Sequence, residues 1–339
     1  MFKTFEMELA GRKLVIETGK MAKQASGAVL VRYGDTVVLV TSTISREARE
    51  GTDFFPLTVD YEEKMYAVGK MPGGFLRREG RPGNSAILNA RLIDRPIRPL
   101  FDKRCRHDVH VVATVLSVEQ DNAPELCGML GASASLAISN IPWDGPIAGV
   151  RVGCVDGQYV INPTQEQLAA SSMNITVAGS ETAILMVEGG AKEVPEEQVL
   201  DAIMFGHEAI KKLVAFQKQI VAEAGKPKME LVFPEIPADI EQAIHDYAAG
   251  PLKDAIFNPD KLTREAHMAE VRKEAEEHFK EIYPDNAADV DACLDHLTKS
   301  IVRHMISVDK IRPDGRALDE IRPITCEVGL LPRVHGSAL

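Results

Sequence analysis

Three short runs near the start of the chain decide its fold class: KLVIET at residues 13–18, AVLVRY at 28–33 and TVVLVT at 36–41. All three are rich in β-branched residues, which favours strands over helices. Gly34-Asp35 separates the last two runs and is a tight-turn signal, so these runs are expected to form a hairpin or meander. The chain therefore begins with a β-sheet.

Helices and further strands follow this sheet. Residues 124–138 combine small and apolar residues at helical spacing, which predicts a helix packed closely on a sheet. The clearest helix is expected at 196–224, ended by Gly225 and Pro227. Additional strands are expected at 109–118, 150–155, 174–178 and 183–187. The pattern predicts a mixed α/β (α+β) fold for residues 1–225.

The character of the chain changes after a linker at residues 226–237, which carries three prolines and no periodicity. Residues 239–299 contain 15 acidic and 7 basic residues and no strand-like run. Two apolar stripes at helical spacing are expected to pack together: Met268, Val271, Ala275, Phe279 and Ile282 in one, and Val290, Leu294, Leu297, Ile301 and Met305 in the other. We therefore expect a small, acidic, all-helical domain at 238–308, for which a solvated scaffold is the simplest interpretation.

Composition limits the class of protein. No apolar run approaches the roughly 20 residues that span a bilayer, and the start lacks an apolar signal stretch, so no membrane partner is expected. Five scattered cysteines without a C-x-x-C pair indicate reduced thiols in a cytoplasmic protein. The net charge of −11 argues against a nucleic-acid partner, but only as an average over the whole chain.

Arginine is concentrated in one segment despite this acidity. Residues 77–106 contain nine basic residues, eight of them arginine, against Glu79, Asp94 and Asp102, a local balance of +6. The planar guanidinium group of arginine suits the oxygen atoms of phosphate. This segment is therefore the candidate nucleic-acid interface.

The candidate residues fall into two groups. A Gly/Pro-bounded loop at 73–82 places Phe75 beside Arg77, Arg78 and Arg81, and a predicted helical turn presents a second set on one face, formed by Arg91, Arg95 and Arg98. Arginines for the backbone and an exposed ring for a base are what a sequence-tolerant single-strand binder needs. The alternative for Arg91 and Arg95 is structural pairing with Asp94 and its neighbours.

Catalytic templates are missing from the sequence. We find no phosphate-binding P-loop, no dinucleotide-binding glycine motif, no zinc-protease motif and no nucleophile elbow. His107 and His110 lie three residues apart without an evident third ligand, so ordinary loop or edge histidines are the simpler interpretation.

The end of the chain repeats features of its start. A shift of 310 positions superimposes Arg12 on Arg322 and Gly19 on Gly329, with further identities nearby. The strand-and-turn pattern thus returns after the helical spacer, although chance similarity remains the alternative. If the repeat is real, residues 309–339 contain the first strands of a second core.

Longer stretches resemble a known family. FFPLTVDYEEKMYAVGKMPGGFLRREGRP at 54–82 and ARLIDRPIRPLF at 90–101 closely resemble the first core of bacterial polynucleotide phosphorylases. INPTQEQL at 161–168, the stretch at 177–210 and IRPDGRALDEIRPI at 311–324 are similar to later parts of the same family.

The resemblance implies a domain order. The first part would be a ribonuclease PH-like βαβα core at 1–225, with subdomains of about 1–145 and 146–225. The linker at 226–237 and the all-helical domain at 238–308 would follow, and a second ribonuclease PH-like core would begin at 309 and be cut short at 339. In the family, KH and S1-type RNA-binding domains come after the second core.

The resemblance also implies an activity. The family degrades single-stranded RNA from its 3′ end with inorganic phosphate as co-substrate and Mg²⁺ (or Mn²⁺) as cofactor, and releases nucleoside diphosphates in messenger RNA turnover. Its catalytic residues and metal ligands are expected beyond residue 339, so this chain is expected to contain no metal ligand and to be inactive alone. The family forms homotrimers, in which the loop matching Phe75, Arg77, Arg78 and Arg81 grips RNA in a central channel, and it can join an RNA-degradation assembly.

Two points stay open at this level. The family loop often has a second aromatic residue where Leu76 stands, and the individual roles of Arg91, Arg95 and Arg98 are not defined. A standalone single-stranded RNA-binding or assembly module without catalysis is the main alternative function. A metabolic phosphate-handling enzyme on a related scaffold is a weaker third.

Overall fold

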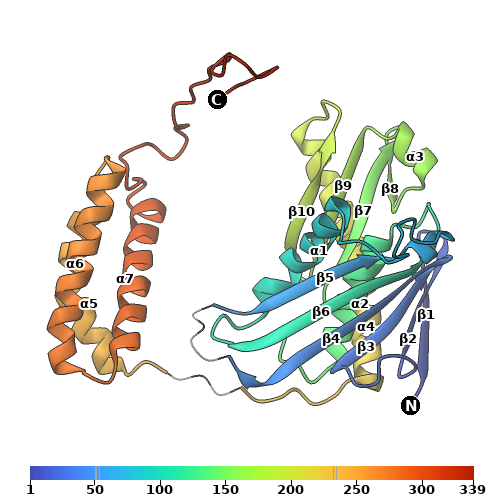
Figure 1. The fold of residues 1–339 in the computed structure, drawn as a ribbon, viewed down its shortest axis with the longest axis horizontal. Coiled ribbons are helices and arrows are strands. Elements are labelled where there is room, and N and C mark those ends of the chain that lie inside the picture. The colour runs from blue at the N-terminus through green and yellow to red at the C-terminus, as the bar shows by residue number, and fades with distance from the viewer. Residues whose placement is uncertain (50–51, 53, 232, 234) are drawn as a thin grey trace. The chain divides into compact units, whose positions relative to one another are not determined.

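The computed structural model describes residues 1–49, 52, 54–231, 233 and 235–339. They form two units, Met1–Phe233 and Pro234–Leu339, which we describe separately. The first unit holds two β-sheets with helices, and the second holds three helices followed by an extended segment (Figure 1). The mixed α/β fold class expected for the first part of the chain is confirmed.

A six-stranded sheet opens the first unit, in the order β1-β2-β3-β4-β6-β5. Its strands are β1 (Lys3–Leu9), β2 (Arg12–Thr18), β3 (Gly27–Tyr33), β4 (Thr36–Ala48), β5 (Leu57–Glu63) and β6 (His107–Ser117). Neighbours pair antiparallel except β5 and β6, which run parallel. Gly34 allows the β3–β4 turn because its φ of +58° lies in the left-handed region. The predicted meander is therefore present, extended by β1 and β5, which sequence analysis did not anticipate.

Helix α2 (Pro124–Ile138) is the centre of the first unit. It contacts β3, β4 and β6 of the first sheet and β7 of the second, and its residues 126–138 are all buried. A Cβ atom at Gly131 would lie 2.4 Å from Cγ2 of Val40, so only glycine permits this close approach. The small residues of α2 thus bring the helix onto the sheet, as predicted.

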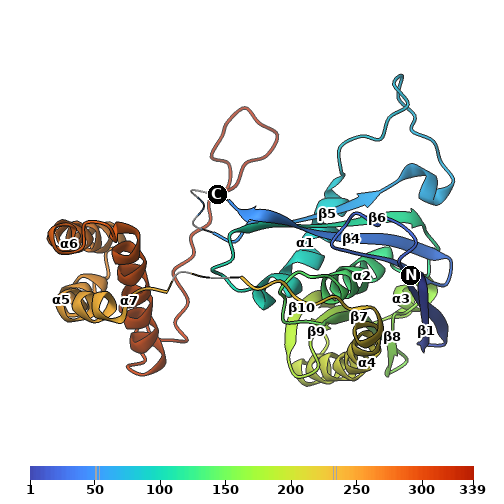
Figure 2. The ribbon, with the colours of Figure 1, turned by 90° about the horizontal axis from the view of Figure 1, so that it is seen from below.

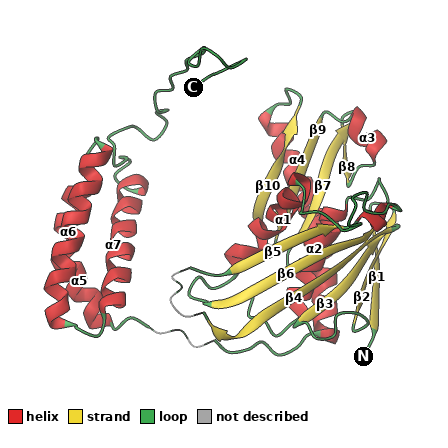
Figure 3. Ribbon diagram, viewed as in Figure 1, coloured by secondary structure: helices red, strands yellow, loops and turns green. Residues whose placement is uncertain are grey.

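The second sheet has four antiparallel strands in the order β10-β9-β7-β8. They are β7 (Ala148–Val155), β8 (Gln158–Ile161), β9 (Met173–Gly179) and β10 (Ile184–Ala191), with α3 (Gln165–Ala170) between β8 and β9. The long helix α4 (Glu196–Ala224) packs on β7 and β9 (Figure 3). One apolar core joins both sheets, so the first unit is a single packed body with two sheets.

Two further helical segments flank the candidate interface. The 3₁₀ helix η1 (Met65–Val68) follows β5, and helix α1 (Asn84–Ile97) continues into the 3₁₀ helix η2 (Arg98–Leu100). α1 packs on β5 and α2, with Ile93 and Ile97 fully buried. The loop at 69–83 lies between η1 and α1 and is thus fixed at both ends.

The second unit contains α5 (Ala238–Ile256), α6 (Lys261–Ile282) and α7 (Ala287–Ser307) around a core of their own. Phe279 and Leu294 are buried at the centre of the two predicted stripes. Arg272 on α6 forms ion pairs with Asp291 and Asp295 on α7. Ile282 departs from its stripe and is half exposed, because α6 ends at this residue.

Residues 309–339 do not form the regular strands that the sequence repeat suggests. Within this described segment the only β-type pairing is an isolated bridge between Val328 and Ala338. A single pair of strands is marginally stable without further strands to bury its faces, and Ile324 and Val328 are about four-fifths exposed here.

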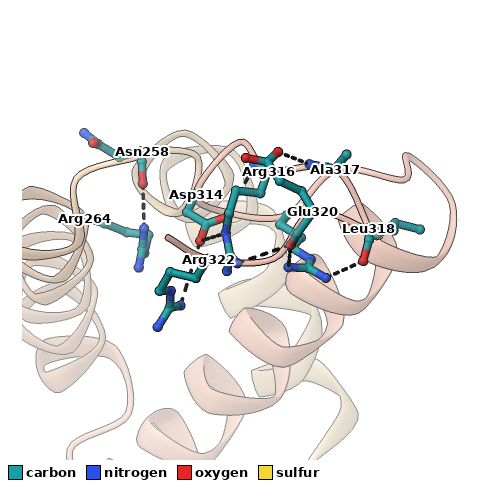
Figure 4. A network of polar contacts seen from close by, with 9 residues as sticks. Asn258, Arg264, Asp314, Arg316, Ala317, Leu318, Glu320 and Arg322 are labelled. Atoms are coloured by element: carbon teal, nitrogen blue, oxygen red, sulfur yellow. Dashed lines mark hydrogen bonds and ion pairs between the residues drawn. The ribbon is translucent and has the colours of Figure 1, made fainter. Parts of the chain in front are cut away.

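Local polar contacts organise the first part of this segment instead (Figure 4). Asp314 accepts a hydrogen bond of 2.8 Å from Arg316, and the carbonyl of Glu320 accepts one of 3.0 Å from Arg312. The pKa of Asp314 is lowered mainly by the hydrogen bond from Arg316.

Candidate nucleic-acid interface

The loop at 69–83 extends away from the sheet of the first unit (Figure 2). Its tip is a tight turn in which the backbone N–H of Arg77 donates to the carbonyl of Gly74 at 2.9 Å, and Arg77 has a φ of +46°. The turn presents the Phe75 side chain fully to solvent, and Leu76 is 73% exposed. A free aromatic ring at a loop tip is available to stack on a nucleic-acid base.

The loop arginines also face solvent. Arg77, Arg78 and Arg81 are all exposed, and among the described residues none of their guanidinium groups has a hydrogen-bond or ion-pair partner. The structure therefore brings together the four loop residues predicted from sequence, Phe75 with three arginines, on one exposed segment.

The three acidic residues of this segment are engaged elsewhere. Glu79 accepts a hydrogen bond of 2.9 Å from the backbone N–H of Met65. Asp94 binds Arg98 through both carboxylate oxygens, at 2.7 and 2.9 Å. Since these carboxylates have other partners, none is paired with a loop arginine.

Asp102 is the third acid and binds Arg104 in the same two-point manner, at 2.7 and 3.1 Å. The hydrogen bond from the Arg104 side chain is the main cause that lowers the pKa of Asp102. Arg104 additionally lies over the ring of Phe233, 4.6 Å from its centroid. This pair is a local structural contact at the far end of the arginine-rich segment.

The helical arginines lie together, as their spacing predicted. Arg91, Arg95 and Arg98 line a groove of about 440 Å³ between α1 and β5. Arg95 forms a 2.8 Å ion pair with Glu188 on β10, and the guanidinium of Arg98 also donates to the carbonyl of Leu57 at 3.0 Å. Two of the three arginines thus have structural partners. The part of all three in binding RNA stays a prediction.

Structural salt bridges therefore involve Arg95 and Arg98, whereas the sequence suggested Arg91 and Arg95. Asp94 pairs with Arg98, one turn along, and Arg91 has no ion-pair partner among the described residues. Glu188 was missed as a partner of Arg95, because it lies 93 positions away on another strand and no local signal joins the two. The tie between Glu79 and Met65 was missed for a similar reason.

The two histidines of interest take ordinary contacts. Nε2 of His110 lies 2.7 Å from a carboxylate oxygen of Asp60, and Nδ1 of His107 lies 3.0 Å from the carbonyl of Ser45. In the part of the chain that the structure describes, no group of three or more His, Cys, Asp or Glu side chains could hold a metal ion. His107, His110 and their partners therefore do not fit a Mg²⁺ or Mn²⁺ site.

Two other features of the described chain bear on its class. None of its described helices combines the length and apolar character needed to cross a membrane. All five cysteines are free, four of them buried and Cys326 exposed. Burial raises the pKa of the Cys127 thiol to about 12, which makes it a packing residue rather than a nucleophile.

Family models match most of the chain. The model for the 3′ exoribonuclease family (ribonuclease PH), domain 1, matches residues 10–142, and the model for domain 2 of the same family matches residues 145–209. The model for the RNA-binding domain of polyribonucleotide nucleotidyltransferase matches residues 239–317. The expected ribonuclease PH-like core in two parts, followed by a helical region, is thereby confirmed.

Curated relatives are similar over nearly the whole chain. Polyribonucleotide nucleotidyltransferases from Heliobacterium modesticaldum, Syntrophomonas wolfei and Geobacillus kaustophilus are 60%, 55% and 55% identical over 99% of it. The chain spans about half the length of these relatives, 47%, 48% and 47% respectively. A solved structure, rice Rrp46, is 15% identical with a TM-score of 0.49, over 65% of this chain and 94% of that one. With two ribonuclease PH-type domains and this degree of identity, the chain belongs to the polyribonucleotide nucleotidyltransferase family.

Proposed function

We propose that this chain is the amino-terminal portion of a phosphorolytic 3′-to-5′ exoribonuclease that acts in messenger RNA turnover. In that reaction an oxygen of inorganic phosphate bonds to the phosphorus of the last phosphodiester. The bond from that phosphorus to the preceding 3′ oxygen breaks, the 3′ oxygen takes a proton, and a nucleoside diphosphate leaves. Family membership supports this activity for the parent protein.

The share of this chain is to guide single-stranded RNA and to provide a scaffold. The observation that carries this proposal is the state of the loop charges: the nearby carboxylates are bound to Met65, Arg98 and Arg104, while three loop arginines and the Phe75 ring face solvent. Unpaired guanidinium groups attract phosphates at long range, and the ring offers a stacking surface that accepts every base. Arg91, Arg95 and Arg98 would provide a second basic surface along α1 and the start of η2.

The remaining parts of the proposal concern organisation. The first core would span 1–225 in subdomains of about 1–145 and 146–225, with a linker at 226–237, a helical domain at 238–308 and the start of a second core at 309–339. Catalytic residues, the ligands of Mg²⁺ (or Mn²⁺) and the site for inorganic phosphate would lie outside this chain. The parent protein would be a cytoplasmic homotrimer that can join an RNA-degradation assembly.

The test is binding of a fluorescein-labelled oligoadenylate, followed by fluorescence anisotropy. We expect the Phe75→Ala/Arg77→Ala/Arg78→Ala variant to lose binding. The control variant Phe54→Ala/Arg32→Ala/Arg46→Ala removes one exposed phenylalanine and two exposed arginines from other parts of the first unit and should bind like the parent chain. Unchanged affinity in the loop variant would refute the RNA-guiding role.

A second candidate is a standalone single-stranded RNA-binding or assembly module. The match of residues 239–317 to a domain described as RNA-binding favours it. The two candidates differ in the parent protein: the exoribonuclease releases nucleoside diphosphates from poly(A) when phosphate is present, and a binding module does not. We expect the 339-residue chain alone to be inactive, and release at the rate of the parent protein would contradict that expectation.

A further inference from the structure

In the described part of the first unit, a single hydrogen bond ties the loop that carries Phe75 to the residues outside it. Among the described residues, the hydrogen bonds made by 71–82 are two. One is the local turn from Arg77 to Gly74, and the other joins Oε1 of Glu79 to the backbone N–H of Met65 at 2.9 Å. Only the second reaches outside the loop, so Glu79 holds the returning end of the loop against η1.

The partner of Glu79 is a group that needs an acceptor. Met65 is the first residue of η1, and the preceding Lys64 provides no side-chain cap. The first N–H groups of a helix have no acceptor within it, and a carboxylate makes a strong charge-assisted bond to such a group. Glu79 therefore caps η1 from within the loop.

The 3₁₀ helix η1, to which Glu79 is hydrogen-bonded, is itself held to the sheet. η1 is closed by hydrogen bonds from Gly69 to Tyr66 and from Lys70 to Met65, each of 3.0 Å. The backbone N–H of Val118, just beyond β6, donates to the carbonyl of Ala67 at 3.1 Å. A contact with η1 is thus a contact with the sheet, and it shortens the stretch without a hydrogen bond to the rest of the described unit to 71–78.

We propose that Glu79 is a positioning residue for RNA binding, which rests on the proposed function of the loop. Its charge lies next to Arg78 in sequence and opposes the attraction of phosphate. Its hydrogen bond orders the loop and lowers the entropy that RNA binding must remove. The two effects have opposite signs, so substitutions can separate them.

Two variants make this separation in the same oligoadenylate assay. Glu79→Ala removes the acceptor and the charge, whereas Glu79→Gln removes the charge and keeps an oxygen acceptor. We expect Glu79→Ala to bind about fivefold more weakly, because only the ordered fraction of the loop is competent to bind. Glu79→Gln should bind as tightly as the parent or more tightly, and Glu8→Ala, which removes an exposed carboxylate from β1, serves as the control for charge alone.

Amide hydrogen exchange at Met65 is the second readout. Exchange should accelerate in Glu79→Ala and stay slow in Glu79→Gln, an effect that charge alone would not produce. Tighter binding by both variants would overturn the inference and assign Glu79 a purely electrostatic effect; equal losses in both would overturn it as well. If the Phe75/Arg77/Arg78 variant binds like the unsubstituted chain, both the proposed function of the loop and the role of Glu79 are wrong. If that variant loses binding but the Glu79 variants do not separate, only this inference falls.

Discussion

The loop at 73–82 and helix α1 carry the same kind of side chain in two different electrostatic states. Arg77, Arg78 and Arg81 have no carboxylate partners among the described residues, whereas Arg95 and Arg98 pair with Glu188 and Asp94. Exposed ion pairs contribute little to stability, but each one cancels a charge that a phosphate would otherwise meet. Under the proposed function, the location of the carboxylates, more than the number of arginines, would therefore determine which surface attracts RNA.

The largest expected effect on RNA binding comes from removing the loop arginines, and removing the helical arginines should affect binding less. Each phosphate contact with single-stranded nucleic acid contributes about 0.7 to the slope of log K against log salt. Arg77→Ala/Arg78→Ala should therefore make this negative slope shallower by about 1.4 and lower the affinity by about 25-fold near 0.1 M salt. Arg95→Ala/Arg98→Ala removes the same charge and should change the slope by less, as measured by anisotropy titrations at several salt concentrations. Equal slopes for the two double variants would contradict the claim that the unpaired loop arginines contact phosphate more than the paired helical arginines do.

The aromatic residue distinguishes the loop from the helix and has the next largest effect. Base stacking is worth about 1–3 kcal/mol, so Phe75→Ala should weaken oligoadenylate binding by at least about fivefold and leave the salt slope unchanged. Phe75→Trp should retain binding, and Leu76→Phe should tighten it by adding a second ring to the loop. A change of slope with Phe75→Ala would indicate that the loop had collapsed rather than lost a stacking contact.

For stability, in contrast to RNA binding, a paired arginine should matter more than an unpaired one. Arg98 holds Asp94 and the carbonyl of Leu57, so Arg98→Ala should lower the free energy of unfolding of the first unit by about 0.5 kcal/mol. Arg91→Ala, on the neighbouring helix α1, should leave it unchanged. The only tryptophan, Trp143, is buried and donates to the carbonyl of Ile97 at 3.0 Å, so its fluorescence in a urea titration reports this unit alone. A larger loss with Arg91→Ala would contradict the assignment of partners.

The smallest expected effect is a pH dependence at Asp102. Its pKa is lowered in the folded chain, mainly by the side-chain hydrogen bond from Arg104, so the folded state binds this proton less readily than the unfolded state. The stabilisation is complete above the ordinary aspartate pKa of 3.8 and is lost as the pH falls through the lowered value. Asp102→Asn should flatten that part of the stability profile measured by Trp143 fluorescence, and an unaltered profile would count against the Asp102–Arg104 pair.

Sequence periodicity was sufficient for the elements with strong local patterns. α2 and α4 span the predicted residues, because alanine, leucine and methionine at helical spacing in α2 and a long apolar stripe in α4 each favour a helix locally. β1 and β5 were missed, since they are edge strands whose identity depends on the neighbours they pair with. The strands suggested for 309–339 did not form, because such strands need a sheet to bury their faces.

The candidate site was predictable in composition but not in pairing. Glycine and proline at 73–82 indicated the loop, and four-and-three spacing indicated the helical face. The pairs Arg95–Glu188 and Met65–Glu79 join residues that are distant in sequence, and only the folded chain brings them together. The charge balance of the segment therefore indicated where a candidate interface lies, while the division between its two groups of arginines required the structure.

The most direct test of the loop as the RNA-binding surface is to locate where RNA touches the chain. An oligoribonucleotide containing a photoreactive uridine analogue would be crosslinked to the parent chain, and the modified peptide would be mapped by mass spectrometry. We predict crosslinks within residues 73–82, centred on Phe75, and their loss with Phe75→Ala/Arg77→Ala/Arg78→Ala. Crosslinks confined to the helices at 238–307, with none in the loop, would contradict the account.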